Sequence, residues 1–285
     1  MLVLTQEAKS FLGQLNASAR KRLGQNFMVR ESELSFIADS MPWKEGESVL
    51  EIGPGLGFLT RVLIQKRLRV LAVEKDRLYV KFLEGYFKNE AFRILERDIL
   101  EIDLEKDFQL TNAIRVIGNI PYHITSPILE WLIHQRRLIS ETVLTVQLEV
   151  AERLAAGPGT KSWGSLSIFL QLYADVNLMK KIDSASFYPA PKVDSAVIKI
   201  RFLDKPRFEI RDEEKFFGLV RRAFQKRRKT LLNALADENL KNFSKPLLVQ
   251  TFERAMIDPM RRAETLTLEE WASLYLALSL PPVLS

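Results

Sequence analysis

Short apolar runs alternate with amphipathic stretches between residue 47 and about residue 148. The apolar runs, rich in branched side chains, predict strands at 48–52, 69–73, 92–95, 114–117 and 142–146. Hydrophobic positions at helical spacing predict helices at 58–65 and 76–87, directly after the first two strands. Because strands that alternate with helices form a parallel sheet covered on both faces, we expect an α/β fold.

The pattern changes near residue 204. A last strand element is expected at 194–202, and residues 203–206 form a connector. The hydrophobic positions that follow keep helical spacing and predict helices at 212–224, 228–236, 246–252 and 268–278. We therefore predict two domains, an α/β domain over 1–204 and a small α-helical domain over 205–285.

The composition of the 285 residues narrows the class of protein. The chain has no cysteine and only His123 and His134, so neither disulfides nor a thiolate or histidine-rich metal site is expected. No apolar run approaches the roughly 20 residues that span a bilayer, and the first 24 residues do not resemble a secretory signal. We expect a cytoplasmic protein that does not bind a membrane.

A net charge of +6 favours an anionic partner, and the basic residues are clustered. One cluster near the start of the chain consists of Arg20, Lys21 and Arg22. A second cluster, in the C-terminal region, consists of Arg221, Arg222, Lys226, Arg227, Arg228 and Lys229. A solvated helix face is the simpler interpretation of one such run. Two runs that flank a candidate site indicate contact with a phosphate backbone, and we predict that both bind nucleic acid.

Three glycines, Gly53, Gly55 and Gly57, follow the first predicted strand and precede its helix. Glycine allows positive φ and lets a ligand pack against the main chain. The loop lacks the Gly-Lys-Ser/Thr end of a P-loop, and its third glycine comes too early for a dinucleotide fingerprint. With Glu51 inside the strand, the E-x-G-x-G-x-G spacing is typical of class I methyltransferases, and a tight turn without a ligand is the alternative.

Two carboxylates end the next two strands. Glu74 can accept hydrogen bonds from both ribose hydroxyls of an adenosyl group, and Asp98 can accept one from the adenine amine. Singly, each could be an ordinary helix-start or loop acid. Because ligands gather at the carboxyl ends of parallel strands, suitable side chains at three successive ends predict a nucleotide pocket there.

The fourth strand ends in the segment Asn119 to Tyr122, beside the predicted pocket. An adenine N6 amine is a weak nucleophile because its lone pair is delocalised into the ring. The side-chain oxygen of Asn119 and the main-chain carbonyl of Ile120 can hold the amine pyramidal and aim its lone pair at a methyl carbon, without a basic side chain. Pro121 fixes the backbone, and Tyr122 offers a ring on which a base can stack. A strand-ending turn without chemistry is the alternative.

Together these motifs resemble the KsgA family of rRNA adenine N6,N6-dimethyltransferases over nearly the whole chain. Besides the glycine loop, Glu74 and the Asn119 to Tyr122 segment, the resemblance rests on residues 21–27, 97–98, 150–154, 187–195 and 223–231. It implies a Rossmann-like class I methyltransferase sheet in the first domain, which binds S-adenosylmethionine, and a small C-terminal α-helical domain that docks RNA.

The resemblance also implies a role for each matching residue. Asn26, Met28, Gly53, Glu74, Asp98 and Asn119 are implied to line the S-adenosylmethionine pocket, and we assign Gln25, Glu51, Gly55, Lys75 and Ile99 to the same pocket. Tyr122 and Phe187 are implied to sandwich the target adenine, with Asn119 and Ile120 as the acceptors. The implied reaction is dimethylation of two adjacent adenosines in the hairpin loop near the 3′ end of 16S rRNA, on a 30S assembly intermediate, by a monomer.

Three alternatives stay open. A relative that methylates 23S rRNA and confers macrolide resistance would share the chemistry, but the long helical C-terminal region and residues 187–195 favour the small-subunit substrate. A non-catalytic nucleic-acid-binding factor could keep the fold, and the intact Asn119 and Tyr122 argue against it. A dehydrogenase is a more distant alternative, which binding of a nicotinamide cofactor would support.

Overall fold

The computed structural model describes residues 2–15, 25–88, 91–237 and 243–279. They form two compact units, of which the first contains Met1–Ala151 and Asp175–Asp204, and the second contains Glu152–Ala174 and Lys205–Ser285. The chain passes from the first unit to the second for the last time between residues 204 and 205. The structure differs from the prediction in placing residues 152–174 in the second unit, where Phe169 packs edge-on against Phe217 with ring centroids 4.7 Å apart.

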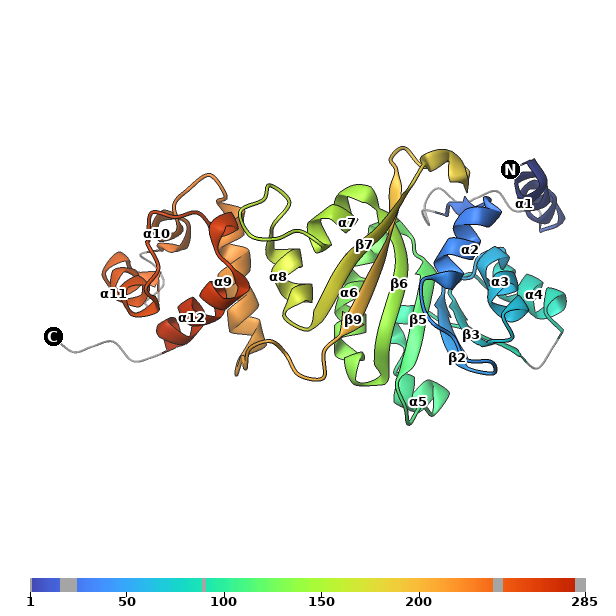
Figure 1. Cartoon of the computed structure of the whole chain (residues 1–285), viewed down its shortest axis with the longest axis horizontal. Coiled ribbons are helices and arrows are strands. Elements are labelled where there is room, and N and C mark those ends of the chain that lie inside the picture. Colours follow the sequence, from blue (N-terminus) through green and yellow to red (C-terminus); the bar gives the residue numbers. More distant parts are fainter. Residues whose placement is uncertain (1, 16–24, 89–90, 238–242, 280–285) are drawn as a thin grey trace. The chain divides into compact units, whose positions relative to one another are not determined.

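The first unit is built on a seven-stranded sheet (Figure 1). Its strands are β2 (Ser48–Ile52), β3 (Arg69–Glu74), β4 (Phe92–Glu96), β5 (Ile114–Asn119), β6 (Ile139–Gln147), β7 (Ala174–Ile182) and β9 (Ser195–Phe202). The spatial order is β4-β3-β2-β5-β6-β9-β7; the five strands from β4 to β6 pair in parallel, and β9 is antiparallel to β6. The strand order reverses between β2 and β5, which opens a crevice at the carboxyl ends of these strands.

The helices of the first unit are α1 (Leu2–Gln14), α2 (Glu31–Asp39), α3 (Phe58–Gln65), α4 (Arg77–Tyr86), α5 (Leu104–Phe108), α6 (Thr125–His134) and α7 (Leu148–Leu154), the last of which continues into the second unit. Helices α2, α3 and α4 lie together beside β2 and β3 (Figure 1). The start of α4 is fixed by Asp76, whose carboxylate accepts the N–H of Leu78 at 3.1 Å. The alternating strands and helices confirm the predicted α/β fold.

A second, two-stranded sheet joins distant parts of the first unit. Strand β1 (Phe27–Met28) pairs antiparallel with β8 (Phe187–Tyr188), and Met28 lies opposite Phe187. Two-residue strands have no periodicity that a sequence pattern can reveal. Their pairing fixes the segment that follows Asn26 against the connection between β7 and β9.

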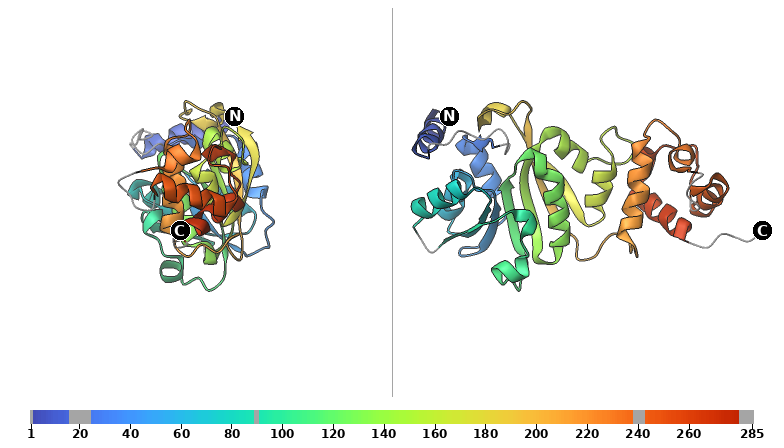
Figure 2. Two further views of the ribbon diagram at one scale, coloured as in Figure 1. Left: turned by 90° about the vertical axis from the view of Figure 1, so that its left-hand side faces the viewer. Right: turned by 180° about the vertical axis from the view of Figure 1, so that it is seen from behind.

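The second unit is helical, as predicted for 205–285 (Figure 2). Its helices are α8 (Ser165–Gln171), α9 (Glu213–Gln225), α10 (Leu231–Leu235), α11 (Lys245–Ala255) and α12 (Leu268–Ser279). Helix α10 begins at Leu231 and not at the predicted residue 228, because Thr230 caps it. Phe216, Phe252 and Trp271 form the centre of this unit's core and are almost completely buried. Within the described ranges, no helix combines the length and the apolar character that crossing a bilayer requires.

Candidate active site

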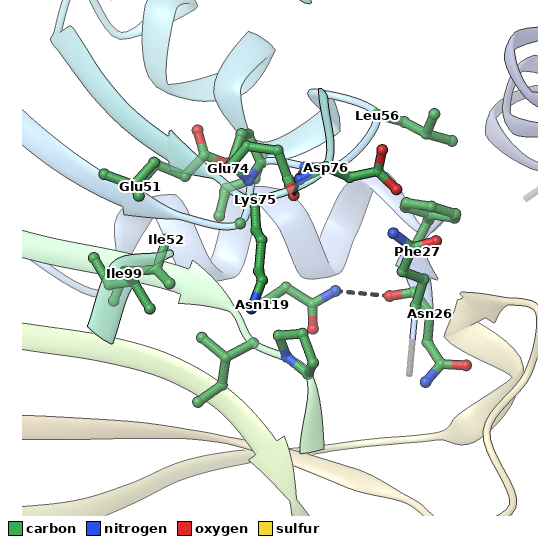
Figure 3. Close-up of a pocket in the computed structure, with 18 of the residues that line it drawn as sticks. Asn26, Phe27, Glu51, Ile52, Leu56, Glu74, Lys75, Asp76, Ile99 and Asn119 are labelled. Atoms are coloured by element: carbon green, nitrogen blue, oxygen red, sulfur yellow. Dashed lines mark hydrogen bonds between the residues drawn. The ribbon is translucent and has the colours of Figure 1, made fainter. Parts of the chain in front are cut away.

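A cavity of about 680 Å³ lies at the carboxyl ends of β2, β3 and β5 (Figure 3). This volume is in the usual range for sites that bind small molecules. Every residue predicted to bind the cofactor lines the cavity, together with three of the four predicted catalytic residues. These lining residues are Gln25, Asn26, Met28, Glu51, Gly53, Gly55, Glu74, Lys75, Asp98, Ile99, Asn119, Ile120 and Tyr122.

Two glycines of the loop after β2 are required for different reasons. Gly57 has a φ of +79°, and a Cβ atom there would lie 2.6 Å from Cδ2 of Leu83 and 2.8 Å from a ring carbon of Phe87. Gly53 has a φ of +65°, but apart from Gly53 itself and its two chain neighbours no atom of the described residues lies within 4 Å of the place of its Cβ. Gly57 is therefore needed by the packing of α3 on α4, whereas a side chain at Gly53 would enter open space at the cavity wall.

Glu74 ends β3 with both carboxylate oxygens bonded to backbone amides. Oε1 accepts the N–H of Asp76 at 2.8 Å, and Oε2 accepts the N–H of Gly55 at 3.3 Å. Burial raises the pKa of Glu74, and these amide bonds oppose the rise. Because a carboxylate has about four lone-pair sites, the side chain can still accept hydrogen bonds from two hydroxyl groups of a ligand.

Glu51 is the acid inside β2 and is only 2% exposed. Its Oε2 atom accepts the hydroxyl hydrogen of Thr60 at 2.7 Å. Burial raises the pKa of Glu51 to about 8; the bond from Thr60 opposes the rise, and the nearby Glu74 adds to it. The side chain is therefore largely protonated near neutral pH and can donate a hydrogen bond as well as accept one.

Asp98 caps the short 3-10 turn Ile99–Glu101 that follows β4. Its Oδ1 accepts the N–H of Leu100 at 3.1 Å, and its Oδ2 lies 2.7 Å from the ammonium of Lys75. Burial by itself would raise the pKa of Asp98, but the Lys75 ammonium and the Leu100 amide hold the pKa below its ordinary value. Asp98 is therefore a charged acceptor at the cavity wall, with Lys75 as its partner at the rim.

Asn119 is the last residue of β5, and its amide is held in one orientation. Nδ2 donates to the main-chain carbonyl of Asn26 at 2.9 Å (Figure 3). This bond fixes the amide nitrogen toward Asn26 and thereby fixes the position of Oδ1, the only acceptor of the amide, for a hydrogen bond from a ligand. Pro121 has a φ of −62° and turns the chain directly after Ile120. Asn119 and Ile120 therefore lie in the same cavity wall.

Tyr122 opens the 3-10 turn Tyr122–Ile124 and lines the cavity. Its hydroxyl lies 2.6 Å from Oγ of Ser195, and its main-chain carbonyl accepts the hydroxyl hydrogen of Thr125 at 3.0 Å. A ring fixed at a cavity wall can stack on a planar ligand. Ser195 is not among the predicted site residues, and no local pattern could have connected it with Tyr122, because the two are 73 residues apart in the sequence.

Phe187, the fourth predicted catalytic residue, does not line the cavity. It lies in β8, is 3% exposed and belongs to the hydrophobic cluster that contains Met28. Its predicted stacking on the target adenine stays a prediction. The cavity wall also contains residues that the sequence did not single out, among them Phe27, Leu56 and His123. Phe27 lies between two predicted residues, and its ring packs edge-on against Tyr79.

The second basic cluster divides into two groups. Arg222 donates to the carbonyl of Leu235 at 3.0 Å and forms an ion pair with Asp237 at 2.5 Å. Arg227 donates to the main-chain carbonyls of residues 161 and 163, at 2.9 and 3.1 Å. Both guanidinium groups therefore bind within the helical unit. The other members, all exposed, are Arg221, Lys226, Arg228 and Lys229. The first cluster, Arg20, Lys21 and Arg22, lies outside the described residues.

Comparison with known proteins places this chain in a family. The family model described as "Ribosomal RNA adenine dimethylase" matches residues 16–278. The ribosomal RNA small subunit methyltransferase A of Alkaliphilus oremlandii is 38% identical, with 94% of this chain and 95% of that protein covered. The protein of the same name from Clostridium botulinum is 36% identical, with 93% of this chain and 96% of that protein covered.

Solved structures agree with the sequence comparisons. A dimethyladenosine transferase from Plasmodium falciparum has a TM-score of 0.73 at 25% identity, with 88% of this chain and 96% of that chain covered. The 23S rRNA methyltransferase ErmE has a TM-score of 0.67 at 24% identity, with 90% of this chain and all of that chain covered, which shows a common fold. From the family match over most of its length and the identity to these relatives, the chain belongs to the ribosomal RNA adenine dimethylase family.

Proposed function

We propose that this chain uses S-adenosylmethionine to dimethylate the N6 amines of two adjacent adenosines in the hairpin loop near the 3′ end of 16S rRNA. Membership of the ribosomal RNA adenine dimethylase family supports the reaction, and the relatives named small subunit methyltransferase support the choice of subunit. The observation that carries the proposal is the bond from Asn119 to the Asn26 carbonyl, which leaves the amide oxygen of Asn119 as an acceptor for an amine in the cavity.

The polar groups of the cavity fit S-adenosylmethionine. The free lone pairs of Glu74 suit the two ribose hydroxyls, and the charged Asp98 suits the adenine amine. The open space at Gly53 lets a ligand pack against the main chain, with the protonated Glu51 behind it. When bound, this cofactor supplies a methyl group that is activated by a positively charged sulfur.

Asn119 and Ile120 promote the transfer by positioning the amine. Oδ1 of Asn119 and the main-chain carbonyl of Ile120 accept hydrogen bonds from the N6 amine, which localises its lone pair and directs it toward the methyl carbon. A basic side chain is not required, because the proton leaves after the new bond has formed. We therefore assign no proton-transfer role to His123, which lies at the cavity wall.

Tyr122 holds the target base. A base in a hairpin loop has to leave its stack to reach a cavity of this kind, and the ring of Tyr122 offers a face on which it can stack. Phe187 is proposed as the second ring of the sandwich. Because Phe187 is 3% exposed, this contact requires its side chain to turn out of the hydrophobic cluster when RNA binds.

The substrate is 16S rRNA within a 30S assembly intermediate, which a monomer of this chain meets in the cytoplasm. The members of the second basic cluster other than Arg222 and Arg227 contact the phosphate backbone, and the helical unit thereby docks the RNA. These members are Arg221, Lys226, Arg228 and Lys229. Arg20, Lys21 and Arg22 are proposed to make a second contact with the backbone.

Incubation with S-adenosylmethionine labelled in its methyl group tests the proposal. Undermethylated 30S subunits, 50S subunits and protein-free rRNA are offered separately, and the labelled nucleosides are identified after digestion. We expect N6,N6-dimethyladenosine at two adjacent positions of the 3′ hairpin, formed in 30S subunits. Label in 50S subunits alone would indicate the enzyme that modifies 23S rRNA. RNA binding without any label would indicate a non-catalytic factor.

A further inference from the structure

The phenol oxygen of Tyr122 forms a hydrogen bond with a buried serine hydroxyl. The phenol oxygen lies 2.6 Å from Oγ of Ser195, and either oxygen can be the donor. Burial raises the pKa of Tyr122, so the phenol is neutral and keeps its hydrogen throughout the physiological pH range. Ser195 itself is completely buried.

Strand pairing and hydrogen bonds fix the backbone at and before Ser195. It is the first residue of β9 and pairs with Gln147 of β6. The preceding residue, Asp194, accepts the N–H of Leu148 with its main-chain carbonyl at 2.9 Å and the N–H of Ser184 with its carboxylate at 3.0 Å. The hydroxyl of Ser195 is therefore presented from a rigid support, which lowers the entropy cost of holding a partner.

The near end of Tyr122 is fixed as well. Pro121 restricts the chain before it, and the hydroxyl of Thr125 donates to its carbonyl at 3.0 Å. Turning the ring away about the Cα–Cβ bond would break the contact with Ser195 and leave a buried hydroxyl without its partner, which is unfavourable. The ring is thus held in one orientation at the cavity wall before any base arrives.

We infer that Ser195 is a positioning residue for methyl transfer, which holds the ring of Tyr122 in the orientation that receives the target base. The inference rests on the proposed function, in which Tyr122 stacks on that base. Ser195 contacts neither the base nor the cofactor; it acts through the phenol oxygen alone. A residue that touches none of the reacting groups can still raise the rate of methyl transfer by fixing the orientation of a group that does.

The chain offers a matched control in Ser186. Ser186 is also completely buried and lies in the connection between β7 and β9, in the 3-10 turn Ser184–Ser186. Its hydroxyl has no hydrogen-bond partner among the described residues. Ser186→Ala therefore removes a buried serine hydroxyl from the same region without touching Tyr122, whereas Ser195→Ala removes the partner of the phenol.

The first test does not depend on enzymatic activity. The protein is labelled with tyrosine carrying carbon-13 at Cζ, whose chemical shift responds to hydrogen bonding of the phenol, and the Tyr122 resonance is identified by its loss in Tyr122→Phe. We expect Ser195→Ala to move this resonance toward the position of solvent-exposed tyrosines, and Ser186→Ala to leave it in place. An unchanged resonance in Ser195→Ala would overturn the inference.

The second test measures methyl transfer in a single turnover, with 30S subunits and S-adenosylmethionine at saturation. Loss of orientation predicts that Ser195→Ala and Tyr122→Phe each slow the transfer roughly tenfold, and that the double variant is no slower than either. The affinity for S-adenosylhomocysteine should stay within about twofold of the wild type, because the cofactor does not meet this hydroxyl. The inference would be overturned if the rate losses of the two single variants multiplied in the double variant. It would also be overturned if Ser195→Ala transferred the methyl group as fast as Ser186→Ala.

The two tests separate failure of this inference from failure of the proposed function. If the wild-type protein places no methyl group on 30S subunits, the proposed function fails, while the Cζ resonance still shows whether Ser195 holds the ring. If the wild type is active and the resonance of Ser195→Ala is unchanged, the proposed function stands and the role of Ser195 does not.

Discussion

The side chain of Asn119 donates an amide hydrogen to the main-chain carbonyl of Asn26 at 2.9 Å, across 93 residues of sequence. Asn26 directly precedes β1, which pairs with β8, so the carbonyl that receives this bond is itself held in place. The bond decides which end of the amide faces the cavity as an acceptor. We therefore expect that asparagine is needed at this position for its nitrogen as much as for its oxygen.

Asn119→Asp tests this requirement, because it keeps an oxygen acceptor and loses the donor. A carboxylate oxygen would lie opposite the Asn26 carbonyl, and two acceptors repel each other, so the side chain should turn away from its place. We expect methyl transfer in a single turnover to fall by roughly 100-fold, the usual effect of removing one aligned polar group. A variant with nearly wild-type transfer would show that the bond to Asn26 does not orient the acceptor.

Gly57→Ala and Gly53→Ala should separate stability from cofactor affinity. Both positions have positive φ, but only a Cβ at Gly57 meets other side chains, with Cδ2 of Leu83 2.6 Å away. We expect Gly57→Ala to lower the free energy of unfolding by about 1–3 kcal/mol more than Gly53→Ala, because of this overpacking. Urea denaturation measures the difference.

The opposite order is expected for cofactor affinity. Because Gly53 faces open space at the cavity wall, a methyl group there would occupy room that the cofactor needs. Calorimetric titration with S-adenosylhomocysteine should therefore show the larger loss for Gly53→Ala. If Gly57→Ala instead weakened binding more at equal stability, the assignment of the two glycines would be reversed.

Glu51 makes the stability of the ligand-free protein depend on pH. Burial raises its pKa from an ordinary 4.5 to about 8, so the folded protein keeps a proton that the unfolded chain releases at lower pH. Its contribution to stability is therefore complete below pH 4.5 and is lost as the pH rises through about 8. At pH 7 the loss is on the order of 3 kcal/mol.

Glu51→Gln removes this titration. The glutamine cannot ionise, so the difference in melting temperature between variant and wild type should change in favour of the variant from pH 5.5 to pH 8.5. The other titrating groups are common to both proteins and cancel in the difference. A difference that stays constant over this range would show that Glu51 does not titrate between these limits.

The exposed basic residues of the helical unit should govern the salt dependence of RNA binding. Replacing all four by glutamine, at Arg221, Lys226, Arg228 and Lys229, is expected to weaken binding to 16S rRNA and to reduce the slope of log K against log salt by roughly 3. The melting temperature should change little, because these side chains are exposed. An unchanged slope would mean that this surface faces solvent in the complex.

Arg222→Gln is the control for that experiment. Arg222 is engaged with Leu235 and Asp237, and its guanidinium lies 4.8 Å from the ring centroid of Phe243. We expect its replacement to lower the melting temperature and to alter the salt slope less than the four-residue variant does. The pair of experiments distinguishes a residue that binds RNA from one that holds the unit together.

Local signals carried much of the fold. An apolar run that ends at a glycine, followed by residues at helical spacing, predicts β2 and α3 with their observed bounds. The family and the enzyme class predicted from the motifs are also confirmed. Strand β6 begins at Ile139, three residues before the predicted start. The prediction missed these residues because they include the polar Ser140 and Glu141. Glu141 is stabilised there by contacts with Lys199 and Arg201 of the neighbouring β9, which no local pattern reveals.

The site was predictable where its residues end strands, and less so where it depends on contacts across the fold. The carboxyl ends of parallel strands meet at one edge, so Glu74, Asp98 and Asn119 could be brought together from the sequence. The bond from Tyr122 to Ser195 depends on how β9 lies beside β6, and the burial of Phe187 depends on the small β1–β8 sheet. Both are long-range pairings without a local signature.

The central claim is that Asn119, although it lines the cofactor pocket, serves methyl transfer by orienting the amine and contributes little to cofactor affinity. The decisive measurement compares Asn119→Ala with the wild type in two quantities, the single-turnover rate of methyl transfer to 30S subunits and the dissociation constant of S-adenosylhomocysteine. The account predicts a nearly abolished rate with an affinity close to that of the wild type. Equal losses of rate and affinity would contradict it.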